Sequence, residues 1–230
     1  MTYPNAQAGL AKYFKGEILN LISVACLIVA SILTFTILGT FVIGDAGVTV
    51  AGGVGVLFII ILTIASFVLA IVGYIIGLVG LKQAGKDHER FAIAFAVQIF
   101  VLIITAVGFA LTIANAGNGI ADNITNSFSR VADVFMVVFV ITGTLDLVHK
   151  VGAADTFNKG YTTMNVIVVM YALSAVAIII PVFFPATVAV GLIELILVLV
   201  SGVLSIVGYI MFLVFLGKAK NALKEEKKEA

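Results

Sequence analysis

Residues 54–81 read VGVLFIIILTIASFVLAIVGYIIGLVGL, a stretch without a charged side chain. As a helix rising about 1.5 Å per residue, this stretch is long enough to cross the roughly 30 Å of hydrocarbon in a bilayer. Five further apolar runs of comparable length lie at residues 18–43, 91–114, 131–148, 166–184 and 188–216. The sequence therefore predicts an all-α polytopic membrane protein, a six-transmembrane-helix bundle.

The composition agrees with a membrane protein. Apolar residues make up 62% of the chain and charged residues only 11%, whereas about a quarter of an average soluble domain is charged. No stretch is polar enough to form a separate soluble domain, so we expect a single six-span domain over residues 1–230. Its cytosolic parts are an N-terminal segment, 1–16, and a charged tail, 217–230, which we expect to be a solvated helical extension. The net charge of +1 indicates no binding of nucleic acid.

The start of the chain resembles a secretory signal, because the first apolar run follows Lys12 and Lys15. The run is too long for the core of a signal peptide and has no small-residue cleavage site, so we interpret it as an uncleaved first span. Cys26 is the only cysteine and lies in this run, which excludes an internal disulfide and a thiolate metal cluster.

The basic residues orient the six spans. Of the 13 basic residues, Arg130 alone falls on the outer side of a six-span arrangement. The inner side holds Lys12, Lys15, Lys82, Lys86, Arg90, Lys150, Lys159, Lys218, Lys220, Lys224, Lys227 and Lys228. Because short cytoplasmic loops are enriched in lysine and arginine, the sequence predicts a multi-pass protein of the cytoplasmic membrane with both termini in the cytoplasm. The outer connections are predicted to be a glycine-rich turn near residues 44–55, a polar loop at 115–130 and a tight connection at 181–185.

An internal repeat organises the spans. Residues 66–75, SFVLAIVGYI, recur as residues 201–210, SGVLSIVGYI. Matches of isoleucine, valine and leucine are frequent in such a composition, but the serine, glycine and tyrosine matches in one register are not. The repeat predicts two related helical hairpins, spans 1–2 and spans 5–6, that flank a middle hairpin and are related by a pseudo-twofold axis along the membrane normal.

Small and polar residues predict the faces on which the helices pack. Helix association in a bilayer depends on close backbone approach and polar contacts, so small residues at helical spacing indicate buried faces. The predicted packing residues are Ser66, Gly73 and Gly77 in the second span and Ser201, Ser205 and Gly208 in the sixth. Similar polar seams are Gln98, Thr105 and Thr112 in the third span and Asn20, Ser23, Ser31 and Thr34 in the first. Packing is one interpretation of these seams, and a polar pathway between the two halves is the other.

Four residues are candidate intramembrane polar groups: Glu194, Gln98, Asp146 and His149. Glu194 is the acid most deeply embedded in an apolar run, and ionisable groups in hydrocarbon are costly unless they function. We keep two interpretations open for it: a buried carboxylate that handles protons or cations, and a carboxylate that is interfacial or makes a helix contact. Asp146 and His149 share a helical face with Thr142, a spacing suited to proton transfer. The alternative for Asp146 is an ion pair with Lys150, one turn later.

The sequence contains no recognisable motif of catalytic, metal-binding or cofactor-binding residues. Residues 80–87, GLKQAGKD, come close to a phosphate-binding P-loop, but a membrane span precedes them and Asp87 stands where a serine or threonine would bind Mg²⁺. Metalloprotease, serine-hydrolase and Cys/His motifs are lacking from the sequence. We therefore expect no enzyme and no cofactor.

The segments GYIIGLVGLKQAGKDHERFAIAF, KVGAADTFNKG and VGYIMFLVFLGKAKNAL resemble small multi-span membrane proteins common in anaerobic bacteria. The resemblance implies a bacterial cytoplasmic membrane and carries over no activity. We expect a non-enzymatic scaffold, subunit or assembly partner that contacts the lipid bilayer and forms a homo-oligomer or binds a membrane protein partner. The alternative is a small transporter or channel in which Glu194 is the coupling carboxylate.

Overall fold

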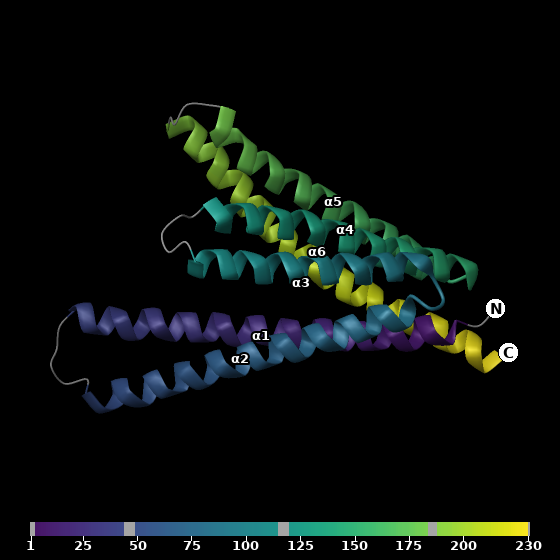
Figure 1. Ribbon diagram of the computed structural model, residues 1–230, viewed down its shortest axis with the longest axis horizontal. Helices are drawn as coiled ribbons and strands as arrows, with labels where there is room; N and C mark the ends of the chain where they lie inside the picture. Colours follow the sequence, from purple (N-terminus) through teal and green to yellow (C-terminus); the bar gives the residue numbers. More distant parts are fainter. Residues whose placement is uncertain (1–2, 44–48, 115–119, 184–187, 230) are drawn as a thin grey trace. The chain divides into compact units, whose positions relative to one another are not determined.

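A computed structural model of the chain describes residues 3–43, 49–114, 120–183 and 188–229. Within these ranges the chain forms α-helices and no strand (Figure 1). The helices are α1 (Pro4–Ile43), α2 (Thr49–Ala84), α3 (Glu89–Ala114), α4 (Ile120–Lys150), α5 (Ala154–Phe183) and α6 (Val188–Glu229). All six are long and apolar enough to cross a membrane. The predicted all-α fold with six spans is confirmed.

The helices extend beyond the apolar runs that predicted them. α1 begins at Pro4, a residue that suits the first turn because its missing N–H is not needed there. α4 begins at Ile120, inside the predicted outer loop at 115–130, so that prediction was wrong for most of the loop. Hydropathy locates the hydrocarbon-crossing part of a helix but not its ends, because the backbone hydrogen bonds of a helix form equally well outside the apolar layer.

The two terminal segments pack against other parts of the protein. Ala6 and Leu10 in the first turns of α1 have no exposed surface, and Ala219 and Leu223 in α6 are almost as deeply buried. α6 continues to Glu229, so the charged tail is helical, as expected. Ala219 and Leu223 are buried in it, whereas Asn221 and Lys224 are exposed, so the described part of the tail is solvated on one side.

Contacts group the chain into two compact units, which we describe separately: residues 12–80, and residues 1–11 together with 81–230. The first is the hairpin of α1 and α2, and the second contains α3 to α6 with the first turns of α1. A compact group of helices need not fold alone, so the organisation as a single domain stays a prediction.

In the α1–α2 hairpin, the two backbones approach each other closely. A Cβ atom added at Gly16 would lie 2.5 Å from the carbonyl oxygen of Gly73 and 2.8 Å from the backbone nitrogen of Gly77. Two helical turns further along, the Ser23 hydroxyl donates to the Ser66 carbonyl oxygen at 2.8 Å, and the Ser66 hydroxyl donates to the Ser23 carbonyl oxygen at 3.0 Å. Small residues and paired hydroxyls thus hold this hairpin together.

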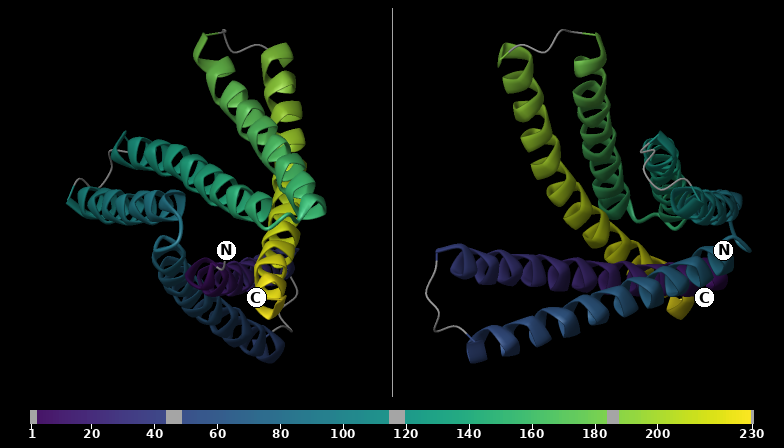
Figure 2. Two further views of the ribbon diagram at one scale, coloured as in Figure 1. Left: turned by 90° about the vertical axis from the view of Figure 1, so that its right-hand side faces the viewer. Right: turned by 60° about the vertical axis from the view of Figure 1, so that its left-hand side comes forward.

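In the second unit, α4 is the central helix. It contacts α3, α5 and α6, and half of its most apolar window is buried, compared with at most 22% for any other helix. α3 lies alongside α4, and α5 and α6 form a hairpin (Figure 2). The largest fully buried side chains of this unit are apolar: Phe91, Phe215, Leu10, Leu81, Ile141, Leu147 and Leu216.

The turn between α4 and α5 requires a glycine. Gly152 has a φ of 75°, in the left-handed region. The N–H of Ala153 bonds the Val148 carbonyl and the N–H of Gly152 bonds the His149 carbonyl, each at 3.1 Å. These two bonds are the Schellman pattern that ends a helix and satisfies its last carbonyls. The turn therefore fixes where α4 stops and α5 begins.

Candidate functional site

The turn between α2 and α3 carries the main cluster of polar contacts. Asp87 in this turn accepts two hydrogen bonds from the start of α1, one from the Asn5 side-chain amide and one from the Ala6 backbone N–H, both at 2.8 Å. The first N–H groups of a helix have no partner within the helix, and a negative charge there is favoured by the helix dipole. Asp87 thus caps α1 from a position far away in the sequence.

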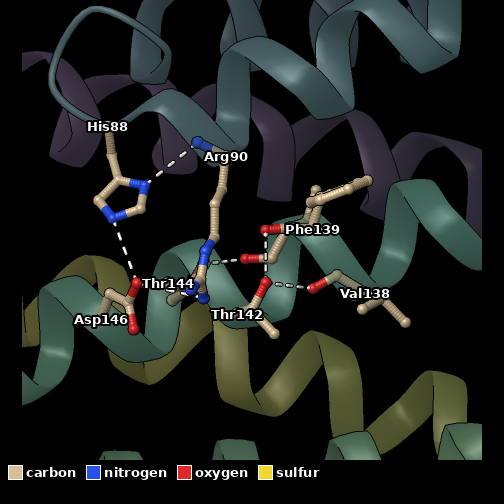
Figure 3. A network of polar contacts seen from close by, with 8 residues as sticks. His88, Arg90, Val138, Phe139, Thr142, Thr144 and Asp146 are labelled. Atoms are coloured by element: carbon tan, nitrogen blue, oxygen red, sulfur yellow. Dashed lines mark hydrogen bonds and ion pairs between the residues drawn. The ribbon is translucent and has the colours of Figure 1, made fainter.

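The next residue, His88, caps α3. Its Nδ1 accepts a hydrogen bond from the backbone N–H of Arg90 at 3.3 Å, which is the position that an N-cap side chain normally serves. Its Nε2 lies 3.4 Å from Oδ2 of Asp146 on α4 (Figure 3). A neutral imidazole that accepts at Nδ1 carries its proton on Nε2, so His88 donates toward Asp146.

Arg90 completes this cluster, which we call the His88 cluster (His88, Arg90 and Asp146). Its guanidinium nitrogen lies 3.1 Å from the same Asp146 oxygen. The alternative that we weighed for Asp146, an ion pair with Lys150, is replaced by this pair with α3. Both side chains are 41% exposed, and pairs of that exposure contribute about 0–1 kcal/mol. The ion pair therefore orients α3 on α4 more than it stabilises them.

The environment of His88 lowers its pKa below the usual value of 6.5. Burial is the main cause, because it disfavours the charged imidazolium, and the positive charges of Lys150 and Arg90 act in the same direction. The Asp146 carboxylate opposes them. The imidazole is therefore neutral at pH 7, consistent with its role as an acceptor at the start of α3.

The predicted grouping of Thr142, Asp146 and His149 does not assemble as one site. The Thr142 hydroxyl donates to the Val138 carbonyl oxygen of its own helix at 2.7 Å. His149 is exposed, and its ring lies 5.3 Å from the ring of Phe157. Sequence spacing placed the three on one face, but the partners of Asp146 are His88 in the turn before α3 and Arg90 in α3. His88 was missed because only the fold brings the 87–90 turn beside the end of α4.

The polar residues predicted to lie within the membrane differ in how far they are buried. Gln98 is half-buried in α3, on the face that also holds the buried Phe91 and Ala94. Thr105 is exposed, so it leaves the seam that the spacing predicted, and the side chain of Thr112 lies outside the described residues. Glu194 is a residue of α6 whose side chain also lies outside the described residues.

Five of the six predicted packing residues are buried. Ser66, Gly73 and Gly77 face α1, where a Cβ at Gly77 would lie 3.7 Å from the ring of Tyr13. In α6, Ser201 and Gly208 are buried, and Gly208 faces Ile167 of α5. Ser205 is exposed and its hydroxyl donates to the Ser201 carbonyl oxygen. The packing face of α6 therefore includes Ser201 and Gly208 but not Ser205.

In α1, too, one residue of the predicted packing face is exposed. Ser23 is buried and Asn20 and Thr34 are half-buried, whereas Ser31 is exposed. Ala30 occupies the buried position instead. A helix buries one narrow stripe, so a polar residue one position away from that stripe faces outward.

A second charged group lies where α5 and α6 meet. Oδ2 of Asp155 is 2.7 Å from the Lys159 ammonium in its own helix and 3.4 Å from that of Lys218 on α6. Sequence spacing could have shown the pair between Asp155 and Lys159, but not the approach of Lys218. Among the described residues, no three His, Cys, Asp or Glu side chains are grouped to hold a metal ion.

Comparison with known proteins adds no family to this picture. No known protein family, no curated protein and no solved structure matches the chain. The six apolar helices carry the assignment alone: the chain is a multi-pass integral membrane protein, with its polar contacts concentrated at the His88 cluster and at the end of the α5–α6 hairpin.

Proposed function

We propose that this protein is a non-enzymatic helix-bundle scaffold, subunit or assembly partner, which acts by associating with copies of itself or with another membrane protein. It lies in the cytoplasmic membrane with both termini on the cytoplasmic side. Support for this orientation comes from the basic residues, of which Arg130 alone falls on the outer side. An even number of spans also returns the C-terminus to the side of the N-terminus.

The observation that carries the proposal is one exposed face of α6, the α6 stripe (Gly191, Gly202 and Ser205). These residues recur at helical spacing and are all exposed. A Cβ atom at Gly191 or Gly202 would meet no other atom within 4 Å. A larger apolar residue would suit lipid equally well, whereas glycine and serine allow another helix to approach closely. The α6 stripe therefore fits a contact with a further helix.

The hydroxyl groups within the spans favour association over transport. The hydroxyls of Thr34, Thr63, Thr142 and Ser174 each donate to a carbonyl four residues earlier in the same helix. In a transport pathway, such hydroxyls would point into a common hydrated cavity. Polar groups that have no water in the bilayer instead form hydrogen bonds within the protein. These four hydroxyls are used for bonds within their own helices.

The test is to block the α6 stripe without disturbing the fold. We expect the double variant Gly191→Leu/Gly202→Leu to lose association, measured by energy transfer between labelled copies in liposomes or by co-purification of a fixed partner. Its thermal stability as a dilute monomer should stay that of the wild type, since both positions are open. Val203→Leu, at a 63% exposed position beside the stripe, is the matched control. A double variant that associates as the wild type does would refute the proposal.

A flux assay separates association from transport. Wild-type protein and Glu194→Gln are reconstituted in proteoliposomes and tested for proton and cation flux. We expect no flux from either. Flux by the wild type that the variant loses would overturn the proposal and establish Glu194 as a coupling carboxylate.

A further inference from the structure

The α5–α6 hairpin contains an open groove of about 300 Å³. One wall comes from α5 and contains polar and charged residues, the other comes from α6 and is apolar, and most of the surface that lines the groove is apolar. The lining residues are Asn158, Lys159, Thr162, Thr163, Ile210, Met211, Val214 and Phe215. Ile210 and Val214 are about half exposed, so the apolar wall opens toward the surroundings of the hairpin. A groove of this volume matches the smallest ligand sites of proteins.

Positive charge gathers at one end of this groove. Lys159 lies in the groove, and Lys218 lies one turn beyond Phe215 on α6. Both ammonium groups point to the same Asp155 carboxylate, at 2.7 and 3.4 Å. Two lysines against one carboxylate leave one net positive charge. The longer contact, from Lys218, is weak enough to exchange for another anion.

The order of groups along the groove follows depth in a membrane. From Lys218 back to Ile210, α6 runs about 12 Å at a rise of about 1.5 Å per residue. The lysines are at the charged end of both helices, Phe215 lies level with Gly160 of α5, and Met211 and Ile210 lie one turn further along α6. A phospholipid has the same order, with phosphate at the interface and acyl chains below it.

We propose that this groove binds an anionic phospholipid. Lys159 and Lys218 contact the phosphate, and an acyl chain lies along Ile210, Met211 and Val214, the residues of the α6 wall that are not buried. Asp155 competes with the phosphate for the two lysines. The net positive charge favours an anionic headgroup over a zwitterionic one. This site goes beyond the proposed association and does not depend on it.

The binding test uses the full-length protein in a neutral detergent. Phosphatidylglycerol is added in one arm, phosphatidylcholine with the same acyl chains in the second, and inorganic phosphate in the third. We expect native mass spectrometry to show one tightly held phosphatidylglycerol, with a matching rise in thermal stability. Neither phosphatidylcholine nor phosphate alone should reproduce it. Equal binding of both lipids, or equal protection by phosphate, would overturn the proposal.

Charge variants locate the site. Lys159→Gln/Lys218→Gln should weaken phosphatidylglycerol binding on the order of tenfold, since each lysine near anionic lipid contributes several-fold. Lys15→Gln/Lys82→Gln removes the same charge at exposed positions of the α1–α2 hairpin and its end, and should bind as the wild type does. Asp155→Asn removes the competing carboxylate and should bind more tightly than the wild type. Equal loss in both lysine pairs would indicate a general charge effect and refute the site.

A variant that fills the groove tests the acyl-chain contact. Val214→Trp places a large side chain on the apolar wall and should abolish the bound lipid while leaving the two lysines intact. Val203→Trp adds the same side chain at an exposed position of α6 outside the groove and should retain the lipid. Retention of lipid by Val214→Trp would contradict an acyl chain in this groove.

Discussion

The α1–α2 hairpin and the α3–α6 unit are both built from apolar helices, but they are held together differently. In the hairpin, Gly16 brings two backbones into contact, and Ser23 and Ser66 exchange hydrogen bonds. In the larger unit, Gly160 of α5 instead receives the ring of Phe215. One contact is between backbones and the other between a backbone and a side chain. The comparison teaches that a glycine in a membrane helix serves either close helix approach or the seating of a large side chain.

The largest effect is expected where backbones touch. Gly16→Ala places a methyl group 2.5 Å from the Gly73 carbonyl oxygen, and this clash is relieved only if the two helices separate. We expect a loss of about 3 kcal/mol, the upper part of the usual range for overpacking, in unfolding by denaturing detergent. Gly202→Ala is the control, because its methyl group meets open space. Equal stability of the two variants would contradict a backbone contact between α1 and α2 at Gly16.

A smaller loss of stability, which a second substitution should partly rescue, is expected at Gly160. The methyl group of Gly160→Ala would overlap the Phe215 ring and lie 2.7 Å from a methyl group of Leu145. We expect a loss of about 2 kcal/mol in the same unfolding assay. Because the clash is with a side chain, Phe215→Leu should restore part of the stability in the double variant, whereas no single side-chain change should rescue Gly16→Ala. Failure of this rescue would show that the backbone of α6 also blocks the methyl group.

A weaker effect distinguishes the two repeated serines. Ser66→Ala removes the hydrogen bond from the Ser66 hydroxyl to the Ser23 carbonyl oxygen but leaves the Ser66 carbonyl as an acceptor for Ser23. It should cost about 0.6 kcal/mol, the average for hydrogen bonds between membrane helices. Ser201→Ala should cost less, since the Ser201 hydroxyl donates to the Val198 carbonyl of its own helix at 3.1 Å. A double-mutant cycle of Ser23→Ala and Ser66→Ala measures the coupling. A larger loss at Ser201 than at Ser66 would contradict the assignment.

The smallest effect concerns the polar end of the α3–α6 unit. The pKa of His88 is lowered in the folded protein, so the unfolded chain binds a proton more readily. Stability is therefore fully present above about pH 6.5 and is lost as the pH falls from there toward the pKa of the folded state. We expect His88→Asn, which keeps a capping oxygen but does not titrate, to flatten this decline, measured by thermal unfolding from pH 5 to 8.

The control for that measurement is His149→Asn, at an exposed position on α4. It should retain the decline of the wild type. Asp146, Arg90 and Lys150 face His88 and are unchanged in both variants, so they do not account for a difference between the two pH profiles. Identical pH profiles for His88→Asn and the wild type would disprove the role of His88.

The helix-packing predictions show how far sequence spacing reaches. Ser66, Gly73 and Gly77 recur at helical spacing and lie on the buried face of α2. The same reasoning placed Ser205 and Ser31 on buried faces, yet both are exposed. Spacing determines which residues share a face, but not which of two adjacent stripes meets the neighbouring helix. The internal repeat stays a prediction, since Ser66 and Ser201 make different hydrogen bonds.

The candidate sites were less accessible to prediction than the fold. Asp146 was singled out, but its partners His88 and Arg90 were not, because they precede it by more than 50 residues in the chain. The groove between α5 and α6 joins residues near 160 with residues near 212. No periodicity in one helix shows such a pairing.

The bilayer as solvent explains why the sequence determined the six spans and only the tertiary structure determined how they pair. A bilayer demands long apolar helices whatever their partners, so hydropathy alone established six spans, and the distribution of lysines predicted their orientation. Helix pairing is a different matter, because lipid is as apolar as a neighbouring helix and the hydrophobic effect does not choose between them. Backbone contact at Gly16, the seat of Phe215 on Gly160 and the cap at His88 depend on that choice, and only the tertiary structure made it.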